Sequence, residues 1–181
     1  MSEGNPWKRV GTRLIYENPW MTLREDQVIS PTGKPGIYSV VDTRVATGVV
    51  AMNDSQEIYL VGQYRYPTDV YSWEIPEGGA DPGENPLDAI KRELREETGV
   101  VAESWHPLGG ELHLSNCVTS EKAYLYLAKG LTQGEMSPDE TEVLKVKRVP
   151  FSKSLEMVET GEIVDCLSVI AILRVARMMG L

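Results

Sequence analysis

Glu93, Glu96 and Glu97 stand three and four residues apart near the middle of the chain. In a helix these positions share one face, so the carboxylates repel one another, and Arg92 can relieve only part of this through Glu96. Glu96 and Glu97 also fall in the last helical turn, where the helix dipole disfavours anions. A cation would remove this cost, and oxygen-only ligands select hard metals such as Mg²⁺ or Mn²⁺. The alternative, and the simpler one for three glutamates alone, is a solvated charged face.

The helix that would position these glutamates has clear ends in the sequence. Asn85 can cap it, Pro86 suits its first position, and Gly99 stands where a helix stops in a left-handed turn. Its buried stripe would consist of Leu87, Ile90 and Leu94. The three glutamates therefore project from a face of their own.

Residues 78–100 resemble the Nudix box: Gly, five residues, Glu, seven residues, Arg-Glu, an apolar residue, any residue, Glu-Glu, any residue, Gly and an apolar residue. The matching positions are Gly78, Glu84, Arg92, Glu93, Leu94, Glu96, Glu97, Gly99 and Val100. A chance match has a probability on the order of 10⁻⁹ per starting position. The resemblance implies a metal-dependent hydrolase in which Glu93, Glu96 and Glu97 hold Mg²⁺ or Mn²⁺, helped by the Glu77 main-chain carbonyl. Gly78, Glu84 and Arg92 would support this set.

The sequence before the box resembles one branch of that family, the ADP-ribose and nucleotide-sugar pyrophosphatases. The resemblance rests on residues 63–67, Gln-Tyr-Arg-Tyr-Pro, and residues 73–78, Trp-Glu-Ile-Pro-Glu-Gly, and it extends over nearly the whole chain. It implies that Arg65, at the end of a strand, contacts the phosphate or ribose of the substrate. A surface arginine at a strand end is the alternative.

The same resemblance implies a general base on a loop after the box. Glu140 matches by position and Glu142 is the reserve, with Glu96 next if neither acts. Without the box, an ordinary acidic surface loop would be the better interpretation.

Aromatic residues outside the box are candidates for stacking on a base. They are Tyr16, Trp20 and Tyr64, and Arg44 is a further candidate for phosphate contact. For Trp20 the alternative is a partly buried side chain at a turn. Where ADP-ribose pyrophosphatases often carry a proline, about sixteen residues beyond the box, this chain has Asn116, which favours a broader nucleoside-diphosphate-sugar preference.

Composition narrows the possible partners. The chain has 181 residues and a net charge of −9, which should repel nucleic-acid backbones and favours a phosphate substrate bound through cations. The start of the chain lacks a secretory signal and the apolar C-terminal segment is interrupted by charges, so we expect a cytoplasmic protein that does not enter the membrane.

The expected fold class is α+β: a Nudix-like α/β/α sandwich with a mixed sheet, at residues 43–181, plus a small N-terminal antiparallel sheet at residues 1–42 for dimerisation and substrate stacking. Strands are expected at residues 9–16, 21–29, 37–42, 47–52, 57–66, 71–75, 105–114, 123–128 and 143–149. A polar loop is expected at 130–141, and helices besides that of the box at 155–160 and 165–179.

The sequence thus predicts a homodimeric enzyme that splits the pyrophosphate of ADP-ribose or a nucleoside diphosphate sugar. The products would be a nucleoside monophosphate and a sugar phosphate. Two alternatives remain open: a Nudix hydrolase of nucleoside triphosphates or dinucleoside polyphosphates, and a non-enzymatic nucleotide sensor with the same fold. The complete acidic set argues against the sensor, because a binding protein has no need of all the catalytic carboxylates.

Overall fold

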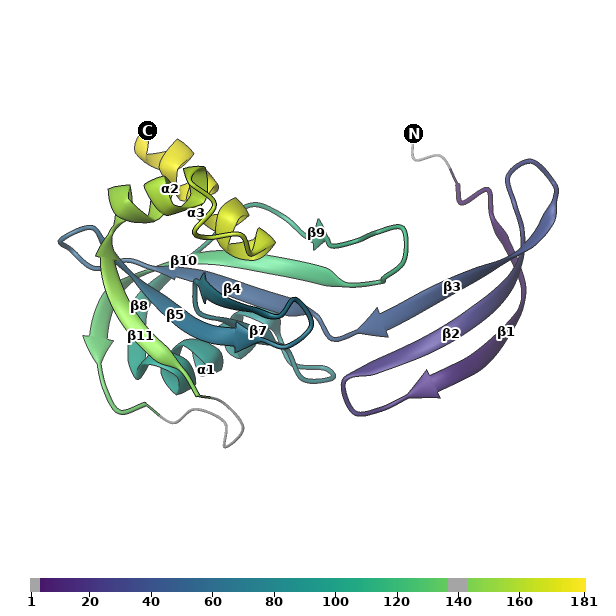
Figure 1. Cartoon of the computed structure of the whole chain (residues 1–181), viewed down its shortest axis with the longest axis horizontal. Helices are drawn as coiled ribbons and strands as arrows, with labels where there is room; N and C mark the ends of the chain where they lie inside the picture. Colours follow the sequence, from purple (N-terminus) through teal and green to yellow (C-terminus); the bar gives the residue numbers. More distant parts are fainter. Residues whose placement is uncertain (1–3, 137–142) are drawn as a thin grey trace. The chain divides into compact units, whose positions relative to one another are not determined.

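The computed structural model of the chain describes residues 4–136 and 143–181. The chain divides into two compact units, which are described separately. The first is Met1–Arg44 with His113–Lys122, and the second is Val45–Leu112 with Ala123–Leu181 (Figure 1).

The first unit is a three-stranded antiparallel sheet in the order β1-β2-β3. Its strands are β1 Lys8–Glu17, β2 Met21–Ile29 and β3 Pro35–Thr43. The first turn is set by the Asn18 side chain, which accepts the main-chain N–H groups of Trp20 and Met21 at 2.9 and 2.8 Å. In the second turn Gly33 has a φ of 80°, which glycine adopts without strain. All three strands lie where the sequence predicts them.

The second unit holds two further sheets. The strands of these sheets are β4 Ala46–Ala51, β5 Glu57–Arg65, β6 Val70–Glu74, β7 Glu77–Gly79, β8 Val100–Pro107, β9 Leu112–His113, β10 Lys122–Gln133 and β11 Lys145–Pro150. Only the end residues His113 and Lys122 belong to the first unit. One sheet has the order β7-β4-β10-β8, with β9 paired to β10, and the other has the order β11-β5-β6. In the first of these sheets the pair β4–β10 is parallel, whereas the pairs β4–β7 and β8–β10 are antiparallel, so that sheet is mixed.

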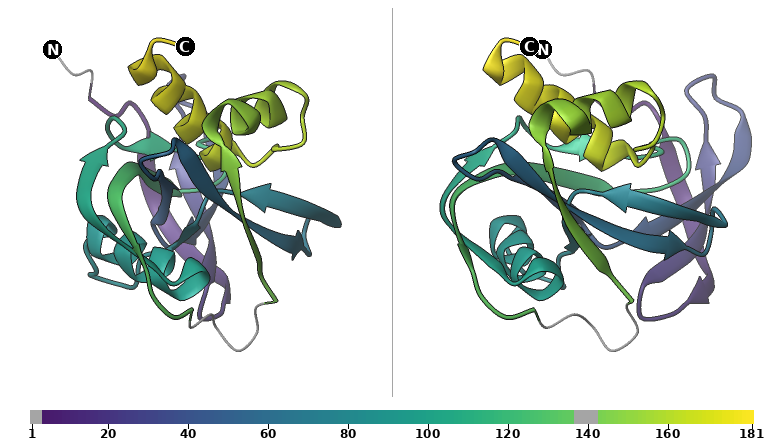
Figure 2. Two further views of the ribbon diagram at one scale, coloured as in Figure 1. Left: turned by 90° about the vertical axis from the view of Figure 1, so that its left-hand side faces the viewer. Right: turned by 60° about the vertical axis from the view of Figure 1, so that its left-hand side comes forward.

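Three helices cover these two sheets: α1 Pro86–Thr98, α2 Phe151–Glu159 and α3 Cys166–Met179. Figures 1 and 2 show α1 on one side of the strands and α2 with α3 on the other. The buried side chains of Ile90 and Leu94 fix α1 in a cluster with Val49, Ala51, Tyr59, Val100 and Ala128. This arrangement confirms the expected α+β fold class with a mixed sheet and an N-terminal antiparallel sheet.

The ends of α1 are those that the sequence predicts. The Asn85 side chain accepts the Leu87 N–H at 2.9 Å, Pro86 is the first helical residue, and Gly99 follows the helix with a φ of 72°. Leu87 is only partly buried, whereas Ile90 and Leu94 are fully buried.

Three of the expected segments have wrong boundaries. The strand expected at 105–114 begins directly after Gly99, as β8, and ends at Pro107 before a turn at Gly109. The polar loop expected from residue 130 begins later, because β10 continues to Gln133. Gly130 has a φ of 67°, and the register of β10 with β8 is the same on both sides of it. Helix α2 starts at Phe151 rather than at 155.

No helix in the described part of the chain is long and apolar enough to cross a membrane.

Candidate active site

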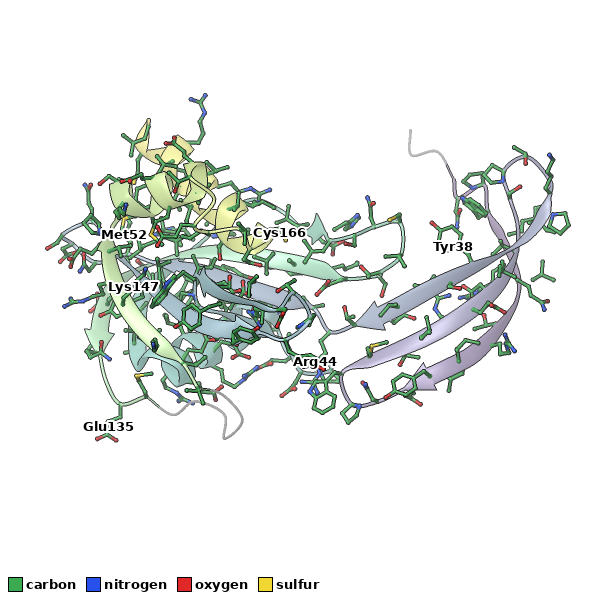
Figure 3. All side chains as sticks on the ribbon, in the orientation of Figure 1. Tyr38, Arg44, Met52, Glu135, Lys147 and Cys166 are labelled. Carbon is green, nitrogen blue, oxygen red and sulfur yellow. The ribbon has the colours of Figure 1, made fainter. Side chains whose placement is uncertain are left out.

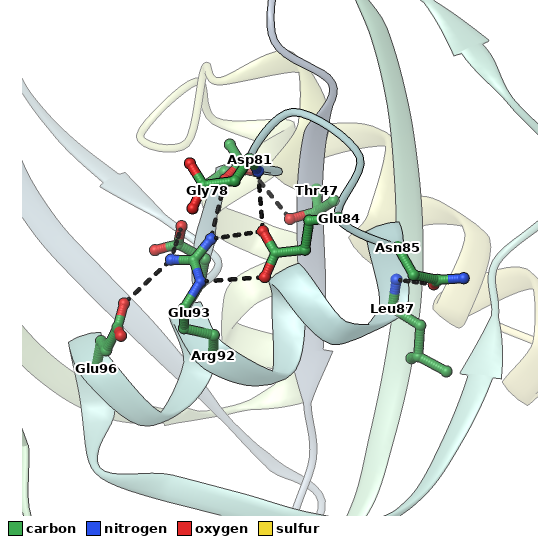
Figure 4. A network of polar contacts seen from close by, with 10 residues as sticks. Thr47, Gly78, Asp81, Glu84, Asn85, Leu87, Arg92, Glu93 and Glu96 are labelled. Carbon is green, nitrogen blue, oxygen red and sulfur yellow. Dashed lines mark hydrogen bonds and ion pairs between the residues drawn. The ribbon is translucent and has the colours of Figure 1, made fainter.

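Arg92, in the middle of α1, is the centre of a polar network (Figure 4). Its guanidinium donates to both carboxylate oxygens of Glu84, at 3.3 and 3.1 Å. It also donates to Glu93 at 2.8 Å, to Glu96 at 3.2 Å and to the Gly79 carbonyl at 3.1 Å. One side chain thus joins the glycine-rich loop, strand β7 and two of the three helix glutamates.

Glu84 completes this network from the loop. Its carboxylate accepts the Asp81 main-chain N–H at 2.8 Å as well as the bonds from Arg92. The bond from Arg92, and after it the bond from Asp81, hold the pKa of Glu84 below its usual value. Glu84 therefore stays ionised as the counter-ion of Arg92.

Gly78 of β7 lies directly against the Glu93 side chain of α1. A Cβ atom added there would overlap the Glu93 carboxylate. The Gly78 carbonyl accepts the Thr47 hydroxyl at 3.0 Å, which ties β7 to β4. The glycine is thus required by space, because the Glu93 carboxylate lies against the main chain.

Gly78→Ala is expected to lower kcat by about tenfold or more with little loss of stability, because a misplaced catalytic group is costly. The overlapping atoms are the end of a flexible side chain, so Glu93 moves aside and the fold adjusts. Steady-state kinetics and a thermal melt measure the two effects. Gly110→Ala is the matched control, because nothing lies within 4 Å of a Cβ added there. Equal kcat in the two variants would contradict this role of Gly78.

Glu97 is the most buried of the three helix glutamates. It is 3% exposed, and its Oε2 accepts the Glu77 main-chain N–H at 3.2 Å. Glu97 thus lies against β7, as do Glu93 at Gly78 and Arg92 at Gly79. Glu93 and Glu97 of the box thus meet at β7, and Arg92 joins Glu96 to Glu93.

A second acidic group lies next to the first. Glu74, Glu77 and Asp165 each bring a carboxylate oxygen within 4.8 Å of the other two. Glu74 ends β6, Glu77 starts β7, and Asp165 caps α3 by accepting the Ser168 N–H at 2.7 Å. The Glu77 main chain, which bonds to Glu97, connects the two groups.

Arg65 supplies the positive charge of this second group. Its Nε donates to both oxygens of Glu74, at 3.0 and 3.1 Å, and its Nη2 donates to Glu74 and, at 2.6 Å, to Glu77. Burial acts to lower the pKa of Arg65, but the bonds to Glu74 and the charge of Glu77 outweigh it and raise that pKa. The side chain stands at the end of β5 and remains 37% exposed.

Glu77 is the member of this group whose negative charge is disfavoured by its surroundings. Burial, followed by the charges of Asp165 and Glu74, raises the pKa of Glu77 well above its ordinary value, although Arg65 acts in the other direction. Its Oε2 is buried and has no hydrogen-bond partner in the described part of the chain. A buried carboxylate oxygen of this kind, among donors that are all oxygens, fits a hard divalent cation nearby.

Sequence reasoning named the Glu77 carbonyl but missed the side chains of Glu74, Glu77 and Asp165. Glu74 lies among apolar residues of a short strand, where a single buried glutamate is unusual and is a usable signal. Asp165 looks like an ordinary helix cap, which it also is. The sequence alone could therefore have pointed to Glu74 as a site residue, but not to Asp165.

The remaining candidates lie elsewhere. Tyr64 is exposed on β5, and its hydroxyl donates to Asp69. In the first unit, Arg44 donates to the Pro19 carbonyl at 3.4 Å (Figure 3). Trp20 is 70% exposed, so the interpretation of a partly buried tryptophan is wrong. Tyr16 is likewise exposed. The two base candidates, Glu140 and Glu142, lie outside the described residues.

The chain matches two family descriptions. Residues 42–165 match the NUDIX domain, and residues 7–41 match the nucleoside diphosphate sugar hydrolase N-terminal domain. Among solved structures, a crystal structure of an ADP compounds hydrolase superimposes with a TM-score of 0.86, covering 99% of this chain and 97% of that one. At 22% identity this likeness shows a shared fold.

Two relatives are similar over most of their length. The ADP-ribose pyrophosphatase of Mycobacterium tuberculosis is 31% identical over 93% of this chain and 83% of its own. The methanol dehydrogenase activator of Bacillus methanolicus is 31% identical over 91% of this chain and 90% of its own. Since the NUDIX match spans more than half of the residues and contains the complete box, the chain belongs to the Nudix family.

Proposed function

We propose that this protein is a metal-dependent hydrolase of ADP-ribose or nucleoside diphosphate sugars, which splits their pyrophosphate bond to give a nucleoside monophosphate and a sugar phosphate. The observation that carries the proposal is that Glu93 and Glu97 lie against β7, while Arg92 joins Glu96 to Glu93 on the same side of α1. Support for the substrate class comes from the N-terminal match at residues 7–41 and from the pyrophosphatase among the relatives.

Glu93, Glu96 and Glu97, with the Glu77 main-chain carbonyl, are the residues that would hold Mg²⁺ or Mn²⁺. The donors are all oxygens, and the adjoining acidic group contains a buried carboxylate oxygen without a hydrogen-bond partner in the described part of the chain. When bound, such an ion neutralises the diphosphate and lowers the pKa of water.

The protein's own residues provide order and charge around this centre. Arg92 and Glu84 orient the glutamates, because their bonds hold Glu93 and Glu96 in one arrangement. Arg65 is held in turn by Glu74 and Glu77 through Nε and Nη2, which leaves Nη1 of this planar group to bind a phosphate oxygen. Glu140 is the proposed general base, with Glu142 as the reserve.

The first unit would contact the nucleoside. Trp20 and Tyr16 are exposed and available for stacking on a base, and Arg44 follows β3 as a candidate for a phosphate. Tyr64, exposed on β5 of the second unit, is a further stacking candidate. Asn116 favours a broad range of sugars over ADP-ribose alone.

The first unit is also expected to form a homodimer. Its small sheet exposes the large apolar side chains of Val10, Leu14, Ile15, Tyr16, Trp20 and Ile37. Exposed apolar surface of this kind marks an interface. Light scattering at micromolar concentration should therefore give twice the chain mass of 20.1 kDa. A mass equal to one chain under these conditions would contradict the proposal.

Metal dependence tests the proposed centre. Hydrolysis should vanish in excess chelator and return with added Mg²⁺ or Mn²⁺, because the acidic face offers only oxygen ligands. Ca²⁺ added to the same concentration serves as the control for a general effect of divalent charge. Full hydrolysis in excess chelator would overturn the assignment of these glutamates as metal ligands.

A further inference from the structure

Helix α1 bears a cavity on a face that lies beside the face of the three glutamates. The cavity has a volume of about 400 Å³, and its walls include Asp88, Lys91, Arg92 and Arg95 of α1 together with Trp105 of β8. The four helix positions are three and four residues apart, so they form one face, distinct from that of Glu93, Glu96 and Glu97. Sites for small molecules typically measure about 300–1,000 Å³.

The cavity carries positive charge in a protein of net charge −9. Lys91 lies 3.5 Å from Asp88, which offsets one cation. Arg92 is occupied by its own glutamates. The exposed Arg95 side chain forms no hydrogen bond or ion pair with any residue that the structure describes. One guanidinium at the rim is therefore available for an anion.

Trp105 adds an aromatic wall that is held in place. Its indole N–H donates to the Ala102 carbonyl at 3.3 Å, and its ring packs edge-on against Tyr126 with centroids 6.5 Å apart. A fixed indole beside a guanidinium and an ammonium is suited to a ligand that combines a flat aromatic ring with an anionic group.

We propose that this cavity binds a nucleoside monophosphate, with its base on Trp105 and its phosphate at Arg95 and Lys91. The site is separate from the glutamate face of α1, so the inference goes beyond the proposed hydrolysis and does not depend on it. Because Arg92 lines the cavity and also bonds to Glu93 and Glu96, an occupant lies beside the residue that orders the glutamates.

The test is a titration of the whole protein with AMP, followed through the Trp105 indole N–H resonance, which a Trp105→Phe variant assigns. Excess chelator is present, so that the glutamate face of α1 cannot bind AMP through a metal ion. AMP should shift this resonance in a saturable way, and Arg95→Glu should weaken the affinity about tenfold or more. Arg177→Glu is the matched control, an exposed arginine on α3 outside the cavity, and should leave the affinity unchanged.

Three results would overturn the proposal. They are the absence of a Trp105 shift at millimolar AMP, equal AMP affinity in the wild type and in a folded Arg95→Glu variant, and equal affinity for AMP and for inorganic phosphate or adenosine alone. Circular dichroism confirms that each variant is folded, and Arg95→Gln repeats the test without a reversed charge.

Discussion

Glu97→Gln is expected to lower kcat by roughly 10²-fold or more, because it removes an anion from the proposed metal centre. The fold should survive the change. Glu97 is buried and accepts the Glu77 N–H, and a glutamine carbonyl oxygen can accept the same bond. The substitution also relieves repulsion among the three helix carboxylates.

Steady-state kinetics with saturating Mg²⁺ and a thermal melt separate loss of catalysis from loss of structure. Glu159→Gln is the matched control, since Glu159 is exposed at the end of α2, away from the box. A Glu97→Gln variant that keeps its activity would remove Glu97 from the ligand set. A variant that loses activity only through unfolding would show a structural role instead.

Glu140→Gln is expected to lower kcat by about 10²–10⁴-fold, the range for a positioned acid or base. A bound metal already lowers the pKa of water, so the glutamate supplies only part of the acceleration. Because its task arises in the transition state, substrate affinity should stay nearly intact.

Glu142→Gln is the matched comparison, two residues away in the same segment, and should have a much smaller effect on kcat. If Glu142→Gln is instead the variant with the strongly reduced kcat, Glu142 is the general base and Glu140 is not. If both variants keep full activity, the base lies within the box, and Glu96 is the next residue to replace.

Local chemistry explains why the box helix could be predicted from the sequence. Asn85, Pro86 and Gly99 act within a few residues of the helix ends that they determine. The same holds for the turn that the Asn18 side chain makes between β1 and β2. Such signals need no knowledge of the rest of the fold.

Contacts between segments that are far apart in the chain leave no pattern in the sequence comparable to these local signals. Glu74 and Asp165 meet at Glu77 only because β6, β7 and the start of α3 come together in three dimensions. The early start of β8 has a similar origin: Val100 is fully buried and its strand pairs with β10, so tertiary pairing takes over directly after Gly99. Neither effect can be derived from the spacing of residues along the chain.

Arg65 shows how the structure adds to a prediction made from the sequence. The sequence offers a substrate-binding arginine or a surface arginine at a strand end as interpretations. The structure places it at that strand end, bonded to Glu74 and Glu77, so it is more than a simple surface residue. Its contact with a substrate phosphate stays a prediction.

Identification of the products from ADP-ribose and UDP-glucose in the presence of Mg²⁺ tests the central claim most directly. Phosphorus NMR distinguishes the two bonds that could break. The proposed function predicts a nucleoside monophosphate and a sugar phosphate in equal amounts, formed by the wild type and nearly absent with Glu97→Gln. Release of a nucleoside diphosphate and a free sugar, or turnover confined to nucleoside triphosphates or dinucleoside polyphosphates, would contradict it. Absence of turnover on every substrate tested would contradict it as well and favour a nucleotide-binding protein.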